Sequence, residues 1–184
     1  FVSCGDLTDI TVDAGNLNYS SQDGVLYNND KTGLICFPGG FTGQFSIPNS
    51  VTAIAESAFE SCDKLTGITI PDSVTSIGEG AFCYCSALTD ITIPSSVTSI
   101  GAAAFYNCSA LTGVYFCGTM PPIFGEVVFG ECSSSLTYCC PDGNPGNITL
   151  SPLMQILDNK DGTCTITACT GPGGDITIPS TLDG

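Results

Sequence analysis

The chain has 184 residues, of which 42% are hydrophobic, so it is long enough and apolar enough to bury a core. It carries 18 acidic residues, three lysines and no arginine or histidine, and its net charge is −15. Such acidity argues against nucleic acid and anionic membranes as partners, and without histidine, a frequent general base and metal ligand, we expect no enzyme and no cofactor.

The first twelve residues fit the second half of a sequence unit that recurs later in the chain. The apolar positions of that half unit are held by Phe1, Cys4, Leu7, Ile10 and Val12. We therefore expect the chain to begin inside one coil of a longer repeat array.

Two short apolar runs follow, at 25–27 and 34–37. The residues between them, 28–33, are rich in turn formers, and the sequence Pro-Gly-Gly at 38–40 ends the second run. This pattern predicts a β-hairpin inserted at about residues 18–40.

A repeat with a period of 23 residues fills the middle of the chain. The sequence Ile-Thr-Ile-Pro at 68–71 recurs at 91–94, an earlier copy begins at Phe45, and a degenerate copy begins at Val114. Alternation predicts a short parallel strand in each copy, ended by proline, with its threonines facing solvent. We expect Phe82 and its equivalents to fill the interior from short helical or 3₁₀ turns. A fixed period of this length is typical of a solenoid of stacked coils.

After Cys132 the period is lost. The segment 141–146 is rich in proline and glycine, and the sequence at 175–180 reproduces that at 90–95. We expect one solenoid over residues 1–140, with a degenerate final repeat at 114–140. Residues 141–184 are predicted to be a cap or linker followed by the start of a second array.

The run I-P-x-S-V-T-x-I-G-x-x-A-F-x-x-C-x-x-L occurs at 70–88 and again at 93–111. It resembles the BspA-like leucine-rich repeats of bacterial and some protist surface proteins, over about residues 1–12 and 45–132. The resemblance implies a β-rich α/β fold, a leucine-rich-repeat solenoid with a curved parallel sheet. It also implies adhesion or protein recognition outside the cell, in some members towards host matrix proteins, and it implies no catalytic residues.

Twelve cysteines divide into two groups. Five occupy one repeat position and are predicted to be buried structural thiols that donate weakly to loop carbonyls: Cys4, Cys62, Cys85, Cys108 and Cys132. The other seven are disulfide candidates if the protein is exported. The cysteine spacing does not match a zinc site, so we expect no metal.

The solvent side of the repeat strands carries aligned columns, and we expect this side to be concave. One column contains Thr8, Thr66, Thr89 and Thr112; another contains Thr11, Thr69, Thr92 and Tyr115; Asp9, Gly67, Asp90 and Gly113 lie between them. These columns fit a ligand-binding surface, and they equally fit the general preference of exposed strands for threonine. The candidate ligand-binding residues are Thr11, Thr69, Asp90, Thr92, Thr112 and Tyr115. Glu56 and Glu79, one coil apart, are interpreted as solvated turn positions rather than as an acid/base pair.

These patterns together favour a non-enzymatic recognition module, secreted or displayed at the cell surface, that binds a protein or a glycan along its solenoid. The alternative is a structural spacer in a long surface stalk. No run of 18 apolar residues occurs, so we expect no direct insertion into a membrane.

Overall fold

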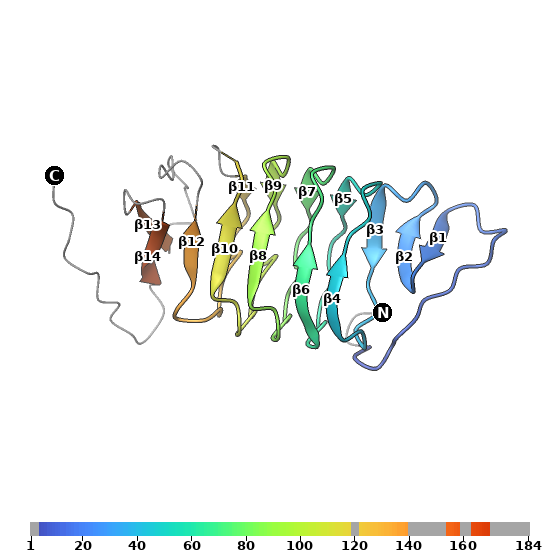
Figure 1. The fold of residues 1–184 in the computed structure, drawn as a ribbon, viewed down its shortest axis with the longest axis horizontal. Coiled ribbons are helices and arrows are strands. Elements are labelled where there is room, and N and C mark those ends of the chain that lie inside the picture. The colour runs from blue at the N-terminus through green and yellow to red at the C-terminus, as the bar shows by residue number, and fades with distance from the viewer. Residues whose placement is uncertain (1–3, 119–121, 140–153, 159–162, 170–184) are drawn as a thin grey trace.

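A β-solenoid of about four coils forms the body of the protein in the computed structural model (Figure 1). The structure describes residues 4–118, 122–139, 154–158 and 163–169, and from residue 138 onward it describes the backbone alone. Within these residues each coil supplies one strand to each of two walls.

The first wall is built from the strand that opens each repeat. It contains β4 (Gly43–Ser46), β6 (Leu65–Thr69), β8 (Asp90–Ile93), β10 (Gly113–Phe116) and β12 (Thr137–Cys139). Pairing is parallel: β4 pairs with β6, and β10 pairs with β8 on one side and with β12 on the other. β6 and β8 are neighbours in Figure 1 but belong to separate sheets. The predicted strand of each repeat is thus present, and we call the solvent side of this wall the main-sheet face.

The second wall contains β3 (Gly33–Cys36), β5 (Ala53–Ile54), β7 (Ser76–Ile77), β9 (Ser99–Ile100) and β11 (Ile123–Phe124), all parallel. β2 (Val25–Asn28) pairs antiparallel with β3 and so forms the expected hairpin. A further strand, β1 (Tyr19–Gln22), pairs with β2 across a turn at Asp23 and Gly24. Because β3 is itself the first strand of the parallel run, the hairpin continues the solenoid instead of standing beside it.

An antiparallel pair extends the first wall beyond β12. β14 (Thr163–Cys169) pairs with β12 on one side and with β13 (Met154–Asp158) on the other. The second array predicted from residue 175 lies outside the described residues.

The third side of each coil is a turn, and here the sequence-based prediction needs correction. The described residues contain no helix and no 3₁₀ helix, so the helical turns, and with them the α/β part of the fold class, are not confirmed. Ser57 and Ser61 have φ values of 54° and 61°, which a right-handed helix does not allow. The same two positions are left-handed in the next coils, at Gly80, Tyr84, Ala103, Asn107, Val127 and Glu131.

Hydrogen bonding explains why these turns do not become helical. The amide of Glu60 donates to Ser57 O within the turn at 3.1 Å, whereas the amide of Ser61 donates to Cys83 O in the next coil at 2.8 Å. The following coils repeat this alternation, for example from Tyr84 N to Tyr106 O at 2.9 Å. Alternate turn amides therefore bind a neighbouring coil, and the turns form a ladder along the solenoid.

Stacked phenylalanines fill the space between the walls and the turns. Phe59 and Phe82 have ring centroids 4.7 Å apart, and Phe82 and Phe105 are 5.0 Å apart with nearly parallel planes. Phe129 continues the stack after the inserted residue, and Phe37 begins it, 4.7 Å from Phe59. Phe37 thus acts as the repeat phenylalanine of a shortened coil, although the sequence pattern did not identify it as one.

Candidate ligand-binding surface

Five of the six candidate ligand-binding residues lie on the main-sheet face. Thr69, Asp90, Thr92, Thr112 and Tyr115 are all exposed. β8 and β10 place Tyr115 directly opposite Thr92, and Gly113 opposite Asp90. The sequence columns therefore correspond to true cross-strand neighbours in this part of the solenoid.

Thr11 does not join this surface, and neither does Thr8. The segment around them forms no strand; Ile10 N donates to Gly24 O at 2.9 Å, and Val12 N donates to Ser21 Oγ at 2.9 Å. The segment therefore contacts the hairpin, which belongs to the second wall, and among the described residues β4 pairs with β6 alone. Sequence alignment placed these residues by repeat phase alone and could not show which neighbour they contact.

The ring of Tyr115 covers Gly113, two residues earlier on the same strand. A Cβ atom at Gly113 would lie 3.0 Å from Tyr115 Cε2 and 3.0 Å from its hydroxyl oxygen. The side chain of Tyr115 is nevertheless 44% exposed. On the adjacent strand, Thr89 Oγ1 donates to Asp90 Oδ2 at 2.9 Å and so orients the carboxylate. An aromatic ring and an oriented carboxylate thus lie next to each other on the main-sheet face.

The threonines of this face have two different roles. Thr112 Oγ1 donates to Thr89 O at 3.2 Å, and Thr137 Oγ1 donates to Thr112 O at 2.9 Å, so these hydroxyl protons tie successive coils together. Thr69 and Thr92 make no side-chain hydrogen bond within the described part of the chain. The hydroxyls of Thr69 and Thr92 are therefore available as donors to a ligand, whereas the hydroxyl proton of Thr112 is already used in a hydrogen bond between coils.

The repeat cysteines form a ladder in three successive coils, in which Cys85 and Cys108 are buried and Cys132 is partly buried. Cys85 Sγ donates to Phe59 O, Cys108 Sγ to Phe82 O and Cys132 Sγ to Phe105 O, each at 3.1 Å. Burial raises the pKa of the Cys62 thiol to about 12. Cys4 differs because it is exposed, in keeping with the position of its segment beside the hairpin. The eight cysteines whose side chains are described are all free: Cys4, Cys36, Cys62, Cys83, Cys85, Cys108, Cys117 and Cys132.

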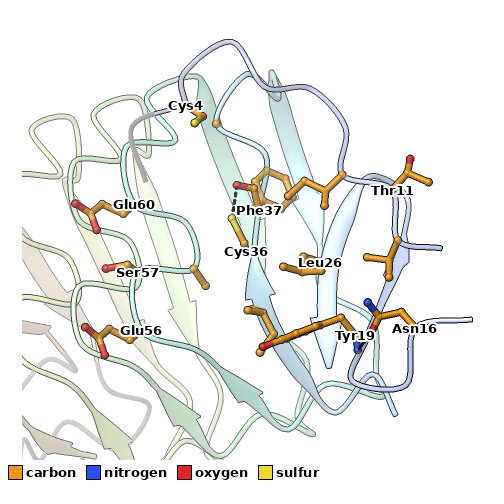
Figure 2. A pocket seen from close by; sticks show the side chains of 15 residues that line it. Cys4, Thr11, Asn16, Tyr19, Leu26, Cys36, Phe37, Glu56, Ser57 and Glu60 are labelled. Atoms are coloured by element: carbon orange, nitrogen blue, oxygen red, sulfur yellow. Dashed lines mark hydrogen bonds between the residues drawn. The ribbon is translucent and has the colours of Figure 1, made fainter. Parts of the chain in front are cut away.

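A pocket of about 520 Å³ lies between the N-terminal segment, the hairpin and the first turn. Figure 2 shows Glu56, Ser57 and Glu60 on one wall, across from Thr11 and Tyr19. Its floor is mostly apolar, from Ile10, Val12, Leu26, Ile35 and Phe37. The sequence carried no signal for this pocket, because it depends on the docking of residues 4–19 against the shortened coil. It lies apart from the main-sheet face.

Two negative findings concern the described residues alone. They contain no group of three or more cysteine, aspartate or glutamate side chains arranged to hold a metal ion. None of their segments is a helix of the length and hydrophobicity needed to cross a bilayer.

Known proteins with the same repeat match most of the solenoid. The family described as BspA type leucine-rich repeat region matches residues 30–141 in six copies. The match begins ahead of Phe45, in agreement with the role of β3 and Phe37 as a shortened coil. No curated protein is a significant match.

Several solved bacterial structures share the fold. A leucine-rich repeat protein from Eubacterium ventriosum ATCC 27560 is 36% identical with a TM-score of 0.63, over 73% of this chain and 35% of its own. The pneumococcal vaccine antigen PcpA is 26% identical with a TM-score of 0.67, over 72% and 33%. A leucine rich cell surface protein from Faecalibacterium prausnitzii A2-165 is 31% identical with a TM-score of 0.55, over 75% and 42%. The matched part thus spans between about a third and about two fifths of each of these proteins.

Proposed function

Because the chain belongs to the BspA-type leucine-rich repeat family, we propose that it is a recognition module that binds a partner protein through its main-sheet face. The observation that carries this proposal is the ring of Tyr115, held over Gly113 beside the oriented carboxylate of Asp90. Tyrosine is enriched among the residues that dominate protein interfaces, since it supplies contact area and a polar tip with few rotatable bonds.

We place this module at the cell surface or outside the cell, with adhesion as its role, and host matrix proteins as one class of partner. Two of the structural relatives are described as a cell surface protein and as a vaccine antigen. A glycan is the alternative ligand, because aromatic rings beside carboxylates and hydroxyls also suit sugars. No catalytic chemistry is part of the proposal.

The size of the surface sets the affinity we expect. Five strands at a spacing of about 4.8 Å span about 20 Å, whereas a standard interface buries about 800 Å² on each partner. The chain also covers only about a third of the length of its relative from Eubacterium. We therefore expect weak binding by this segment alone and tighter binding when neighbouring coils contribute.

A photo-crosslinking residue tests the proposal, because it captures whichever protein contacts the labelled position. We would place p-benzoylphenylalanine at Thr92 on the main-sheet face, and at Thr75 on the second wall as the matched exposed control. Purified matrix proteins should crosslink from the first position and not from the second. Replacing Tyr115 and Asp90 together with alanine should abolish the crosslink, and Tyr19→Ala, at another exposed tyrosine, should leave it unchanged.

The hydrogen bonds of Thr112 and Thr137 favour a second candidate function, a structural spacer in which the threonines stabilise the stack of coils. A spacer predicts no crosslink from either position. Equal crosslinking from both walls would instead contradict a defined main-sheet site.

A further inference from the structure

All five glutamates of the chain lie on the turn side of the solenoid. We define the turn face as the solvent side of the turns at 55–61, 78–84, 101–107 and 125–131. Its carboxylates are Glu56, Glu60, Glu79, Glu126 and Glu131, of which all but Glu60 are exposed. The two lysines that the structure describes are engaged elsewhere: Lys31 Nζ donates to Gln22 Oε1, and Lys64 Nζ donates to Gly5 O.

Two tyrosines lie at the centre of the turn face. Tyr84 and Tyr106 come from successive coils, and their rings are 6.1 Å apart with an angle of 76° between their planes. Tyr84 is 45% exposed. The positions equivalent to Tyr84 carry Ser61 and Asn107. Those equivalent to Tyr106 carry Glu60, Cys83 and Gly130, so packing does not require an aromatic ring at either position.

The next coil fixes the position of Tyr106. A Cβ atom at Gly130 would lie 2.9 Å from Tyr106 Cδ2, so the ring rests against the bare glycine backbone. Glu131 follows immediately, and partial burial together with the Glu131 charge raises the pKa of Tyr106. At the other end, burial and the Glu60 charge raise the pKa of Cys83, the neighbour of Tyr84. The negative charges of Glu131 and Glu60 therefore reach the two ends of the tyrosine pair.

We propose that the turn face is a docking surface for a basic, extended segment of a partner protein, with one arginine or lysine side chain seated against Tyr84 and Tyr106. A ring face attracts a cation through its quadrupole, and the edge-to-face contact between Tyr84 and Tyr106 holds the two rings in a fixed orientation. The flanking carboxylates pair with neighbouring basic residues. This surface is separate from the main-sheet face, so the inference does not rest on the function proposed above.

The spacing of the glutamates suits such a segment. Glu79 and Glu126 occupy the same turn position two coils apart, with Ala102 between them. Two coil spacings amount to about 10 Å, which is close to the length of one polyproline II turn, three residues at about 3.1 Å each, after which a side chain points to the same face again. A basic side chain at every third residue would therefore meet one carboxylate after another, on a chain whose net charge is −15.

Fluorescence anisotropy tests the proposal with a defined probe, a fluorescein-labelled nonapeptide that carries arginine at every third residue and glycine at the others. We expect it to bind the intact chain with an affinity that falls as salt is added, because exposed charges are screened. The same peptide with glutamine in place of arginine should not bind. A lysine version should bind more weakly than the arginine peptide, since arginine stacks on aromatic rings.

Three variants distinguish peptide binding through the tyrosine pair from peptide binding through the overall negative charge alone. Tyr84→Asn keeps the net charge and suits the left-handed backbone, as Asn107 does in the next coil, and it should weaken binding about five-fold. Gly130→Ala should weaken binding by displacing Tyr106, although it removes neither a ring nor a charge. Tyr115→Ser, at an equally exposed tyrosine on the main-sheet face, should leave binding unchanged.

Circular dichroism of each variant confirms that it remains folded. If the arginine peptide binds the unaltered chain, Tyr84→Asn and Gly130→Ala with equal affinity, it binds through negative charge alone, and the proposal is overturned. Loss of peptide binding in Tyr115→Ser, with Tyr84→Asn unaffected, would move the basic ligand to the main-sheet face and would overturn it as well. Failure here leaves the crosslinking result at Thr92 unaffected, so the two proposals fail independently.

Discussion

The ring of Tyr115 lies against the backbone of Gly113, with its Cε2 atom 3.0 Å from where a glycine-to-alanine change would put a methyl group. Gly113→Ala should therefore displace the ring while leaving the fold intact, because the contacting atoms are the far end of a flexible side chain. We expect the free energy of unfolding to change by less than about 1 kcal/mol. NMR with labelled tyrosine should show the Tyr115 ring signals shift and the Tyr84 signals stay in place.

Gly67→Ala is the matched control for that change. Gly67 lies on the same face, and a methyl group there would contact the side chain of Gln44 at 3.1 Å instead of a tyrosine. If the main-sheet face is the binding surface around Tyr115, Gly113→Ala should lower the crosslinking from Thr92, and Gly67→Ala should not. Equal loss in both variants would mean that Tyr115 has no special role.

Thiol alkylation should separate the cysteines by burial. Cys4 and Cys117 are exposed, whereas Cys85 and Cys108 are fully buried and donate to backbone carbonyls. Since the reactive species is the thiolate, iodoacetamide at pH 8 should modify the exposed pair and spare the buried pair until urea unfolds the chain. Peptide mass spectrometry checks this, and modification of Cys108 in the folded protein would contradict the ladder.

The stability of the fold should fall at alkaline pH because of Cys62. Burial raises the pKa of this thiol from 9.0 to about 12. Between these values the unfolded chain binds fewer protons than the folded one, so the free energy of unfolding decreases as pH rises above about 9. One thiol contributes at most about 1.4 kcal/mol per pH unit. Urea unfolding at several pH values should show a decrease, and Cys62→Ala should make the decrease less steep even if it lowers stability at pH 7, while Cys108 and Tyr27, whose pKa values are also raised, keep their share.

Tyr27 should be replaceable by phenylalanine without loss of stability. Its side chain is 1% exposed, and its hydroxyl is buried without a hydrogen-bond partner among the described residues. A buried hydroxyl without a partner costs about 1–3 kcal/mol, so Tyr27→Phe should leave the free energy of unfolding unchanged or raise it by about 1 kcal/mol. Thermal and urea unfolding measure the change. A loss above about 1 kcal/mol would show that the hydroxyl is satisfied in solution.

The period of 23 residues was sufficient to predict the strand of each repeat and its register. Tyr115 stands opposite Thr92, as the alignment requires, because each coil adds one strand to the wall. It was not sufficient for Thr11, whose segment pairs with Gly24 and Ser21, since tertiary order rather than repeat phase decides which strands meet. The pocket beside Glu56 was missed for the same reason.

The turns were predicted wrongly for a different physical reason. Ser57, Ala103 and Val127 have no intrinsic preference for positive φ, so their sequence gives no sign of a left-handed position. Gly80, in the same column, is the only residue of the set with that preference. The inter-coil hydrogen bonds impose the conformation, and only an aligned stack reveals them. The concentration of glutamates on the turn face, by contrast, was readable from the alignment once all four turns were placed.

Val127 should be the most strained residue of the turn face. Its φ is 47°, a region that is unfavourable for side chains branched at Cβ, and the left-handed conformation costs about 1–2 kcal/mol. Its side chain is 45% exposed, so little packing is lost on its removal. Val127→Gly relieves the strain and adds about 0.5–1 kcal/mol of chain entropy to the unfolded state. We expect a net gain of about 0.5–1 kcal/mol in the free energy of unfolding.

Gly80→Val is the reverse change at the equivalent position, where φ is 57°. It should lower the free energy of unfolding by at least the amount that Val127→Gly adds, because it introduces the same strain into a coil whose spacing to its neighbours is regular. Urea unfolding of the two variants and of the double variant measures both effects, and at this separation they should be additive. If Val127→Gly loses stability while Gly80→Val is tolerated, the turn ladder does not force these residues to be left-handed, and the hydrogen bonds between the coils do not control the turn conformation.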